Sequence, residues 1–566
     1  MKKIKRILAI TMMLALLVPM AFGLTASAAG SITVKPQNSI KSLNGGTEFK
    51  AFQIFTLTTD GDAYDYELNS VYAGFQAAYA SVLDTLTLKE YIESLTDPLN
   101  PGQILPGSEG DMYELARALW MWSDDSTNGV SPAIGAVDGN NAKFTGLDAG
   151  YYVVAGTGKP STTETVMSFA MLCTLKEDEN LEINVKADSP TIDKEVWYHN
   201  VGSDPTNTSD AGWGEWTDVN MNDTVYFKHE SAVPVMTGYD IYWFIVHDSM
   251  SEGLTLDKTS FKVTVGSNTL TKVDDESDFT PNTAQYFVIE DDDYDAYTSY
   301  TNGTNFAIVI NPDWFVGQTE GVAIIITYEA VLNENAVIAG TGNPNKVYLE
   351  YSNNPFDTGG GSYGDGETED TPEDEVWVYT FKLDIFKFTG ANPEEPENGD
   401  PLAGAEFELY IGDAETGEYV TFFLIVEGDE DNPAEYRVAM EDDTPTTDTL
   451  ITPESGLINI IGLDEGTYYL VETQPPASYN PNPTPREIVI VNVDIDASHE
   501  VEYTIDDNTP VDFNEVPADV NIYNGSGQEF PGTGGIGRTI FIVVGLTLMV
   551  GAVVTLVVRR RVVKTF

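Results

Sequence analysis

The sequence predicts a mostly β protein made of tandem β-sandwich domains, with some helix in the N-terminal domain. A chain of 566 residues is long enough for roughly three or four domains. Alternating apolar and polar residues, as in 405–409 and 347–351, are typical of strands with one buried face. The segment 146–152 (GLDAGYY) is echoed by 462–468 (GLDEGTY), which indicates that two of the sandwiches are related.

The charge and the residue counts exclude several classes of protein. With 28 Lys and Arg against 90 Asp and Glu, the formal net charge of -62 repels polyanions, so we expect no nucleic-acid partner. The one cysteine, Cys173, permits no intrachain disulfide, and its apolar strand predicts a place in the core. The histidines stand too far apart to suggest a zinc site, and we expect no cofactor. Acidic runs such as 291–293 and 373–375 leave calcium binding open, although solvation explains them as well.

Residues 1–28 have the pattern of an export signal peptide. Four basic residues precede an apolar run from 7 to 24, and the run ends in the small residues Ala26, Ser27 and Ala28. We expect cleavage after Ala28, so the body of the protein is predicted to be secreted.

Segment 530–566 has the order pentapeptide, apolar stretch, basic tail. The pentapeptide consists of Phe530, Pro531, Gly532, Thr533 and Gly534. The uncharged stretch 540–558 is close to the roughly 20 residues that a transmembrane helix needs. This order resembles the cell-wall sorting signal of Gram-positive surface proteins, whose pattern is Leu-Pro-x-Thr-Gly and from which Phe530 departs. The resemblance implies that a sortase thiolate attacks the Thr533 carbonyl and that the protein becomes anchored to peptidoglycan.

Composition divides the exported body into three domains. The acidic, Gly-rich stretch 358–374 has too few apolar residues to pack and is expected to be a linker. A second boundary is expected near Ser189-Pro190, where one strand pattern ends and another begins. The predicted domains are 30–188, 189–357 and 375–527.

Helical spacing appears only in the first of these domains. Asp111 is placed to cap a segment that puts Leu115, Leu119 and Trp122 on one face. We expect this helix to contribute to core packing.

Alternation in the C-terminal domain places polar side chains among apolar ones. Lys387 shares a strand face with Leu383 and Ile385, and both Glu472 and Asn524 share the inward parity of their own strands. Burial should lower the pKa of Lys387 and raise that of Glu472. A neutral amine can attack the Asn524 amide when a protonated carboxyl polarises it, giving an isopeptide bond with loss of ammonia. Parity alone nevertheless favours a conventional buried polar network.

Two motifs in this domain carry a resemblance to the Cna B-type domains of sortase-assembled pilins. Segment 468–479 (YYLVETQPPASY) looks like the E-box of that family, and segment 401–407 (PLAGAEF) looks like its second-strand motif. The resemblance implies an immunoglobulin-like, Cna-type sandwich. It also implies an autocatalytic bond between Lys387 and Asn524, with Glu472 as the promoting acid.

The middle domain repeats this logic. Lys194 shares a face with apolar neighbours near the start of the domain, and Asn353 does so near its end. This arrangement resembles the middle domain of pilus shaft proteins, which implies a bond between Lys194 and Asn353 promoted by Asp248. Alternation does not decide which acid faces the lysine, so Asp240 remains the alternative. In the first domain Gly156 occupies the place of the promoting acid, and we expect no bond of this kind there.

Lys186 is the candidate lysine for linking one subunit to the next. It follows an alternating segment in which Ile183 and Val185 face inward, so its own amine is expected to face outward. In pilus shaft subunits the linking lysine occupies this position, usually in Tyr-Pro-Lys-Asn, whereas here Val185 and Ala187 flank it. An ordinary surface lysine is the alternative.

Over essentially its whole length, the chain resembles a major shaft subunit of a sortase-assembled Gram-positive pilus. The resemblance implies a structural protein, not an enzyme, that is located in a cell-wall-anchored surface pilus. Its implied partners are pilin-specific and housekeeping sortases, further copies of itself joined head to tail, minor pilins and peptidoglycan. The alternative is a wall-anchored adhesin or tip pilin that binds a host ligand without polymerising.

Overall fold

The computed structural model describes residues 29–526 and Leu548, apart from short internal segments. The segments left out are 38–39, 44–48, 61–62, 81–82, 84, 101, 160–164, 199–204, 207–211, 291–302, 357–365, 391, 415–416, 496–500 and 507–515. The expected signal peptide, the pentapeptide 530–534 and the stretch 540–558, Leu548 excepted, lie outside the described residues. Among the residues that are described, no helix is long and apolar enough to cross a bilayer.

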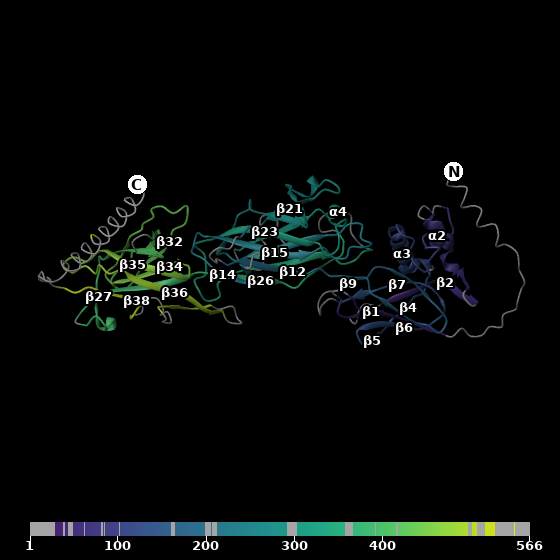
Figure 1. Ribbon diagram of the computed structural model, residues 1–566, viewed down its shortest axis with the longest axis horizontal. Coiled ribbons are helices and arrows are strands. Elements are labelled where there is room, and N and C mark those ends of the chain that lie inside the picture. Colours follow the sequence, from purple (N-terminus) through teal and green to yellow (C-terminus); the bar gives the residue numbers. More distant parts are fainter. Residues whose placement is uncertain are drawn as a thin grey trace, which may run out of the picture.

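Three β-sandwich domains follow one another along the longest axis of the molecule (Figure 1). The prediction of a mostly β protein with tandem sandwiches is therefore confirmed. Helices of more than four residues occur, in the described part of the chain, only in the N-terminal domain.

The N-terminal domain packs two sheets together and covers one of them with helices. The sheets have the strand orders β11-β1-β6-β5 and β10-β7-β2-β3, with β4 paired to β2. The strands are β1 (Gly30–Lys35), β2 (Lys50–Asp60), β3 (Ala63–Leu68), β4 (Ala133–Ile134), β5 (Ala136–Asp138), β6 (Asn141–Leu147), β7 (Gly150–Ala155), β8 (Thr157–Gly158), β9 (Val166–Met167), β10 (Met171–Leu175) and β11 (Asn180–Asn184). The helices are α1 (Ala73–Ala78), α2 (Leu88–Ser94) and α3 (Glu109–Asp124), with short 3-10 turns at Ser70–Tyr72 and Ser126–Asn128.

Helix α3 confirms the predicted helix but begins earlier than expected. Leu115 and Leu119 are buried on one face, and Trp122 is partly buried against the same core. The N-cap is Ser108, so Asp111 lies in the first turn and does not cap the helix. On the neighbouring sheet Cys173 is half-buried in β10, and burial raises the pKa of its thiol to about 12. This thiol is therefore a poor nucleophile.

The middle domain consists of two facing sheets. One has the order β13-β12-β15-β23-β18-β19 with β17 paired to β23, and the other has the order β14-β26-β24-β16-β22-β21-β20 with β25 paired to β24. The strands are β12 (Ile192–Trp197), β13 (Trp213–Gly214), β14 (Trp216–Asp218), β15 (Thr224–Ala232), β16 (Phe244–Met250), β17 (Leu254–Leu256), β18 (Lys262–Val265), β19 (Asn268–Thr269), β20 (Thr271–Lys272), β21 (Gln285–Glu290), β22 (Thr304–Ile310), β23 (Ala323–Leu332), β24 (Asn343–Ser352), β25 (Thr368–Asp370) and β26 (Asp374–Tyr379). A 3-10 turn at Glu276–Asp278 and the single-turn helix α4 (Pro312–Phe315) connect them.

The end of the middle domain differs from the sequence prediction. Strand β25 lies within the expected linker 358–374, and β26 lies at the start of the expected C-terminal domain. Both strands pair with β24 and so belong to the middle domain. The physical reason is that β26 (DEVWVY) buries Val376 and Val378 in the middle core although it begins with acids. The boundary between the two domains therefore lies at Thr380.

The C-terminal domain is a sandwich of two six-stranded sheets. Their orders are β28-β27-β34-β32-β31 with β38 paired to β27, and β30-β29-β35-β36-β37 with β33 paired to β29. The strands are β27 (Phe381–Thr389), β28 (Asp400–Pro401), β29 (Glu406–Ile411), β30 (Glu418–Tyr419), β31 (Phe422–Val426), β32 (Ala434–Val438), β33 (Leu450–Ile451), β34 (Leu457–Leu463), β35 (Gly466–Gln474), β36 (Arg486–Ile495), β37 (Val501–Ile505) and β38 (Val520–Tyr523). A 3-10 turn lies at Pro396–Asn398.

A single residue separates the last strand of the middle domain from the first strand of the C-terminal domain. This residue, Thr380, is fully buried. Its carbonyl accepts a hydrogen bond from the Ala339 amide of the middle domain at 2.8 Å. Its hydroxyl donates to the Leu463 carbonyl of the C-terminal domain at 3.1 Å. Both domains therefore hold the connection between them.

Acidic side chains gather where these two domains meet. The Tyr198 hydroxyl donates to Glu465 at 2.6 Å, and the Asp464 amide donates to Asn220 at 3.0 Å. Burial, reinforced by Glu465, raises the pKa of Asp218 to about 7. Burial, reinforced by Asp218, raises the pKa of Asp464 to about 9. The junction thus favours the protonated form of two carboxyl groups.

Candidate functional site

The C-terminal domain buries Lys387 in its core. Lys387 lies on β27 and shares its inward face with Leu383 and Ile385. Strand β38 runs parallel to β27 and pairs Ile522 with Lys387, so Asn524 follows two residues later on the same side. Both Lys387 and Asn524 are buried. The parallel pairing of the first and last strands is therefore what brings the amine and the amide together.

Three side chains meet at this point, and we call them the C-terminal centre: Lys387, Glu472 and Asn524. The Lys387 amine donates to the amide oxygen of Asn524 and lies 2.9 Å from Oε1 of Glu472. The amide nitrogen of Asn524 donates to the same Oε1 at 2.9 Å. The second oxygen of Glu472 accepts from the backbone amide of Asn482 at 2.6 Å, which fixes the carboxylate. The structure thus brings together the three residues that the sequence predicted.

Burial sets the protonation of the C-terminal lysine. Desolvation lowers the pKa of Lys387, although the hydrogen bond and the charge of Glu472 act in the opposite direction. The ring of Phe407 lies 5.5 Å from the amine and closes the site from the opposite sheet. A lowered pKa increases the share of neutral amine, which is the nucleophilic form.

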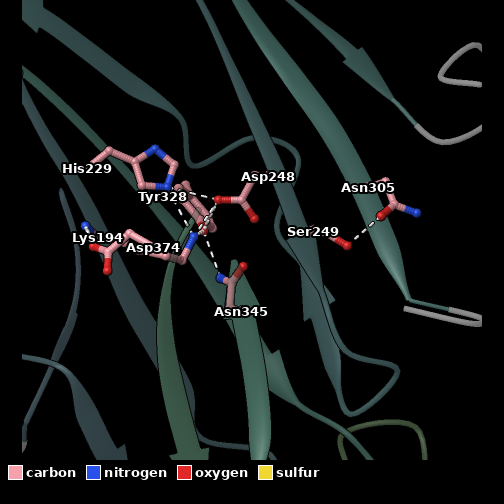
Figure 2. A network of polar contacts seen from close by, with 8 residues as sticks. All are labelled: Lys194, His229, Asp248, Ser249, Asn305, Tyr328, Asn345 and Asp374. Carbon is pink, nitrogen blue, oxygen red and sulfur yellow. Dashed lines mark hydrogen bonds and ion pairs between the residues drawn. The ribbon is translucent and has the colours of Figure 1, made fainter. Parts of the chain in front are cut away.

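The middle domain holds a second buried lysine, Lys194 on β12 (Figure 2). Its amine donates to Oδ2 of Asp248 on β16 at 2.5 Å and to the hydroxyl of Tyr328 on β23 at 2.8 Å. Nε2 of His229 on β15 lies 3.1 Å from the amine and 2.8 Å from the same carboxylate oxygen. Figure 2 shows these four side chains converging, with Asn345 of β24 beside them.

Asn345 completes this group, which we call the middle centre: Lys194, His229, Asp248, Tyr328 and Asn345. The amide nitrogen of Asn345 donates to the Tyr328 hydroxyl at 2.8 Å, and the hydroxyl donates to Asp248 at 2.8 Å. Every member is at least 98% buried. Because β12, β15 and β23 belong to one sheet and β16 and β24 to the other, the centre spans the space between the sheets.

The expectation that Asn353 faces Lys194 is wrong. The Asn353 amide donates to the Thr165 carbonyl at 3.3 Å and lies 3.4 Å from Glu369, at the border with the N-terminal domain. Asn345 and Asn353 have the same strand parity, but they lie eight residues apart, or roughly 26 Å along an extended chain. The register of β24 with β16 places Val347 opposite Asp248 and Asn345 opposite Met250, so Asn345 lies two residues from the position opposite the acid, whereas Asn353 lies six residues from it.

The choice between the two candidate acids is settled by position. Asp240 is exposed and forms an ion pair with Arg117 of helix α3. Asp248 is buried and contacts the Lys194 amine. Asp248 is therefore the acid of the middle centre.

Burial acts on the lysine of the middle centre as it does on Lys387. Desolvation lowers the pKa of Lys194, opposed by the charge of Asp248. Burial, reinforced by the lysine, lowers the pKa of His229 to about 4, so its imidazole is neutral at physiological pH. Burial alone would raise the pKa of Asp248, but Lys194 and His229 together lower it. The 2.5 Å contact between the Lys194 amine and Oδ2 of Asp248 is the route along which a proton can pass between the two groups.

The sequence prediction missed three members of the middle centre: His229, Tyr328 and Asn345. Each shares the inward parity of its strand. His229 follows Val225 and Phe227, and Tyr328 follows Ile324 and Ile326. An inward tyrosine or histidine in such a pattern looks like ordinary core. The signal that could have found them is the buried lysine itself, which needs polar partners from the facing strands.

Lys186 is exposed, as predicted. It lies between β11 and β12, flanked by the buried residues Val185 and Ala187. Its amine lies 5.0 Å from the centre of the Tyr113 ring, and its carbonyl accepts from the Phe169 amide at 2.8 Å. The backbone is thus fixed while the amine faces outward. The role of Lys186 in linking subunits stays a prediction.

Gly156 in the N-terminal domain leaves no room for an acid. A Cβ at this position would come within 2.5 Å of Cγ of Phe49. The absence of an isopeptide bond in this domain remains a prediction.

The acidic runs show no metal cluster where they are described. Glu373 and Glu375 lie 3.5 and 3.9 Å from the Lys346 amine, and Asp374 accepts from the backbone amide of Lys194 at 2.6 Å. The run 291–293 lies outside the described residues. Within the described part of the chain, no group of three or more His, Cys, Asp or Glu residues is placed to hold a metal ion.

Comparison with known proteins identifies a related sequence and a related solved structure that each cover most of the chain. The chain is 23% identical to the trypsin-resistant surface T6 protein of Streptococcus pyogenes serotype M6, with 97% of this chain and 99% of that protein aligned. The solved structure of the T6 backbone pilin of serotype M6 Streptococcus pyogenes, described as a modular three-domain structure, superposes with a TM-score of 0.50 at 16% identity. That superposition covers 90% of this chain and 96% of the pilin. The fold of this chain is therefore that of a backbone pilin.

One segment also matches a family model. Residues 391–509 match the SpaA prealbumin-like fold domain. The match includes Glu472 and lies between Lys387 and Asn524 in the sequence. The C-terminal domain of this backbone-pilin fold is therefore the part that the family model covers.

Proposed function

We propose that the chain is a shaft subunit of a covalently polymerised, sortase-assembled pilus and that two internal isopeptide bonds stiffen it. The observation that carries the proposal is the pair of buried centres, each with a lysine, a carboxylate and an asparagine in one hydrogen-bonded group. Similarity to the T6 protein along nearly the whole chain, together with the fold shared with the T6 backbone pilin, supports the pilus role. In this proposal the chain is a structural subunit and a sortase substrate, and it acts on no substrate but itself.

In the C-terminal centre the bond joins Lys387 to Asn524. The neutral amine attacks Cγ of Asn524, a C–N bond forms, and the amide nitrogen leaves as ammonia. Glu472 touches both nitrogens at 2.9 Å, so it can take the proton from the amine and deliver one to the leaving group. The buried position excludes water, which would otherwise compete as nucleophile and solvate the charges.

In the middle centre we propose the same reaction between Lys194 and Asn345, with Asp248 as the promoting acid. The two reacting groups share the Tyr328 hydroxyl as a hydrogen-bond partner, at 2.8 Å each. Since Lys194 and Asn345 lie on facing sheets, this bond would cross the sandwich.

Polymerisation would use Thr533, which follows the C-terminal domain in the sequence, and Lys186, which lies between the N-terminal and middle domains. A sortase would cleave after Thr533 and transfer its acyl group to the Lys186 amine of the next copy. A bond of this kind between unlike surfaces does not close on itself, so it produces a filament. Pilin-specific and housekeeping sortases, minor pilins and peptidoglycan would be the partners of this filament at the cell surface.

The test uses wall extracts boiled in detergent and probed for this chain. Lys186→Ala should abolish the ladder of covalent polymers and leave exported monomer. Lys176→Ala is the matched control, because Lys176 is also exposed in the N-terminal domain and its amine lies 5.1 Å from the Tyr64 ring. It should leave the ladder intact.

Two other results would change the proposal. A ladder that persists in Lys186→Ala would move the linking role to another lysine. Monomer alone in the wild type would refute the shaft subunit in favour of an adhesin or tip pilin that does not polymerise.

A further inference from the structure

The two centres differ in how the acid reaches the asparagine. In the C-terminal centre, Oε1 of Glu472 accepts directly from the Asn524 amide nitrogen at 2.9 Å. In the middle centre, the Asn345 amide nitrogen donates to the Tyr328 hydroxyl, and that hydroxyl donates to Asp248. Aspartate is one methylene shorter than glutamate. The phenol thus occupies the position between acid and amide where the longer carboxylate makes its own contact.

We propose that Tyr328 is a catalytic residue of the middle centre, transferring a proton between Asp248 and the amide nitrogen of Asn345 that leaves as ammonia. This inference rests on the proposed function, since it assigns a role within the Lys194–Asn345 reaction. Tyr328 contacts both reacting groups, the Lys194 amine and the Asn345 amide nitrogen, at 2.8 Å.

The proton balance of the reaction requires such a group. The Lys194 ammonium first gives a proton to Asp248, and the neutral amine then attacks Cγ of Asn345. The resulting tetrahedral carbon bears an NH2 group with a free lone pair, which must gain a proton before its C–N bond breaks. The proton that the attacking nitrogen loses returns to Asp248. The sum is amine plus amide giving a secondary amide plus ammonia.

The Tyr328 hydroxyl can supply this proton by reversing its hydrogen bonds. With Asp248 ionised, the hydroxyl donates to the carboxylate and accepts from Asn345. Once Asp248 is protonated, the carboxylic acid becomes the donor to the phenol oxygen, and the phenol proton can turn to the leaving nitrogen. Each transfer then spans a contact of 2.8 Å, and none requires water.

The surroundings hold the phenol in this position. Its ring stacks on Phe227 at a centroid distance of 5.2 Å and lies edge-on to Phe306 at 5.3 Å. Burial raises the pKa of Tyr328, so the hydroxyl keeps its proton. His229 contacts the same oxygen of Asp248 at 2.8 Å, which holds the carboxylate toward the phenol.

The experiment removes only the hydroxyl. We would compare wild type, Tyr328→Phe and Tyr286→Phe as exported full chains in cells lacking sortase, by intact mass and by mapping of linked peptides. Each bond lowers the mass by about 17 Da through loss of ammonia. Tyr286 is the matched control, because it is buried in the same domain and its hydroxyl donates to the Phe261 carbonyl at 3.1 Å.

We expect Tyr328→Phe to slow the Lys194–Asn345 bond roughly 100-fold, the range of one general acid-base group. The Lys387–Asn524 bond should form normally and serves as an internal reference in the same chain. Tyr286→Phe should form both bonds. A Tyr328→Phe chain that forms the middle bond at the wild-type rate would overturn the role of Tyr328, whereas a wild type with no mass deficit would overturn the proposed function.

A folding defect is detected by near-ultraviolet circular dichroism and trypsin resistance. If Tyr328→Phe fails to fold, replacement of Tyr328 by 3-fluorotyrosine keeps the hydroxyl and makes it more acidic. A changed rate of middle-bond formation is then expected. An unchanged rate would overturn the proposal.

Discussion

Replacing Glu472 by glutamine removes the proton-transferring group of the C-terminal centre and nearly preserves its shape. Without the carboxylate, neither the Lys387 amine nor the leaving nitrogen of Asn524 has a group to exchange protons with. We expect the bond to be absent, so that the deficit of the measured mass against the mass calculated from the sequence is about 17 Da smaller than in wild type. Glu406→Gln, on the adjacent strand β29, is the control and should leave this mass deficit unchanged.

The stability change follows from the size of the loop that the bond closes. Lys387 and Asn524 are 137 residues apart in sequence. On the loop-entropy model, a cross-link of this span restricts the unfolded chain enough to contribute about 5 kcal/mol to the free energy of unfolding. For a domain of this size, that corresponds to a fall in Tm of roughly 10 to 20 °C.

Differential scanning calorimetry and mass spectrometry on the same samples would test both parts. A Glu472→Gln chain with the wild-type mass deficit would refute the role of the carboxylate. A chain that lacks the bond but unfolds at the wild-type temperature would refute the loop-entropy reasoning and leave the chemistry intact.

Two further predictions concern the middle centre and the junction between domains. Asn345→Ala should remove the middle bond, so that the deficit of the measured mass against the mass calculated from the sequence becomes about 17 Da smaller than in wild type. Asn353→Ala should leave both bonds intact, and the reverse pattern in linked-peptide maps would contradict the register of β24. The folded-state pKa is raised to about 7 for Asp218 and to about 9 for Asp464, so folding favours the protonated form of both carboxyl groups. Their contribution to the free energy of unfolding is therefore complete below about pH 4, the pKa of an unfolded aspartate, and is lost as the pH rises through the folded-state values. Thermal unfolding of the bonded chain at pH 5, 7 and 9 should therefore show a falling Tm. That fall should be smaller in Asp218→Asn and unchanged in the exposed control Asp442→Asn, and an equal fall in all three chains would show that the junction acids are not responsible.

Strand alternation together with the two family motifs predicted the C-terminal centre, because Lys387, Glu472 and Asn524 each have the inward parity of their strands and the motifs place those strands in a known sandwich. The same rule failed for Asn345. Asn345, near the start of β24, and Asn353, just after its end, have the same parity, and only the pairing with β16 distinguishes them. Register depends on contacts between strands far apart in the sequence, which a local pattern does not contain.

Other features could not be predicted for different reasons. An inward tyrosine such as Tyr328 has the same pattern whether it packs or exchanges a proton, since its role depends on the side chains that face it. The acids at the start of β26 made that strand look solvated, although its valines belong to the middle core. The domain assignment of β26 is decided by pairing with β24, and composition carries no information about pairing.

The connection at Thr380 has a consequence for how a filament of these subunits would stretch. A flexible linker between domains acts as an entropic spring that lengthens under small forces before any domain is loaded. Here β26 passes into β27 through one buried residue whose two hydrogen bonds hold it to both domains. No flexible segment lies between the two domains, so tension on the middle domain would pass directly to the C-terminal domain. A single-molecule pulling experiment should show the force at this joint rising steeply at short extension, as expected for a rigid connection and not for a flexible linker.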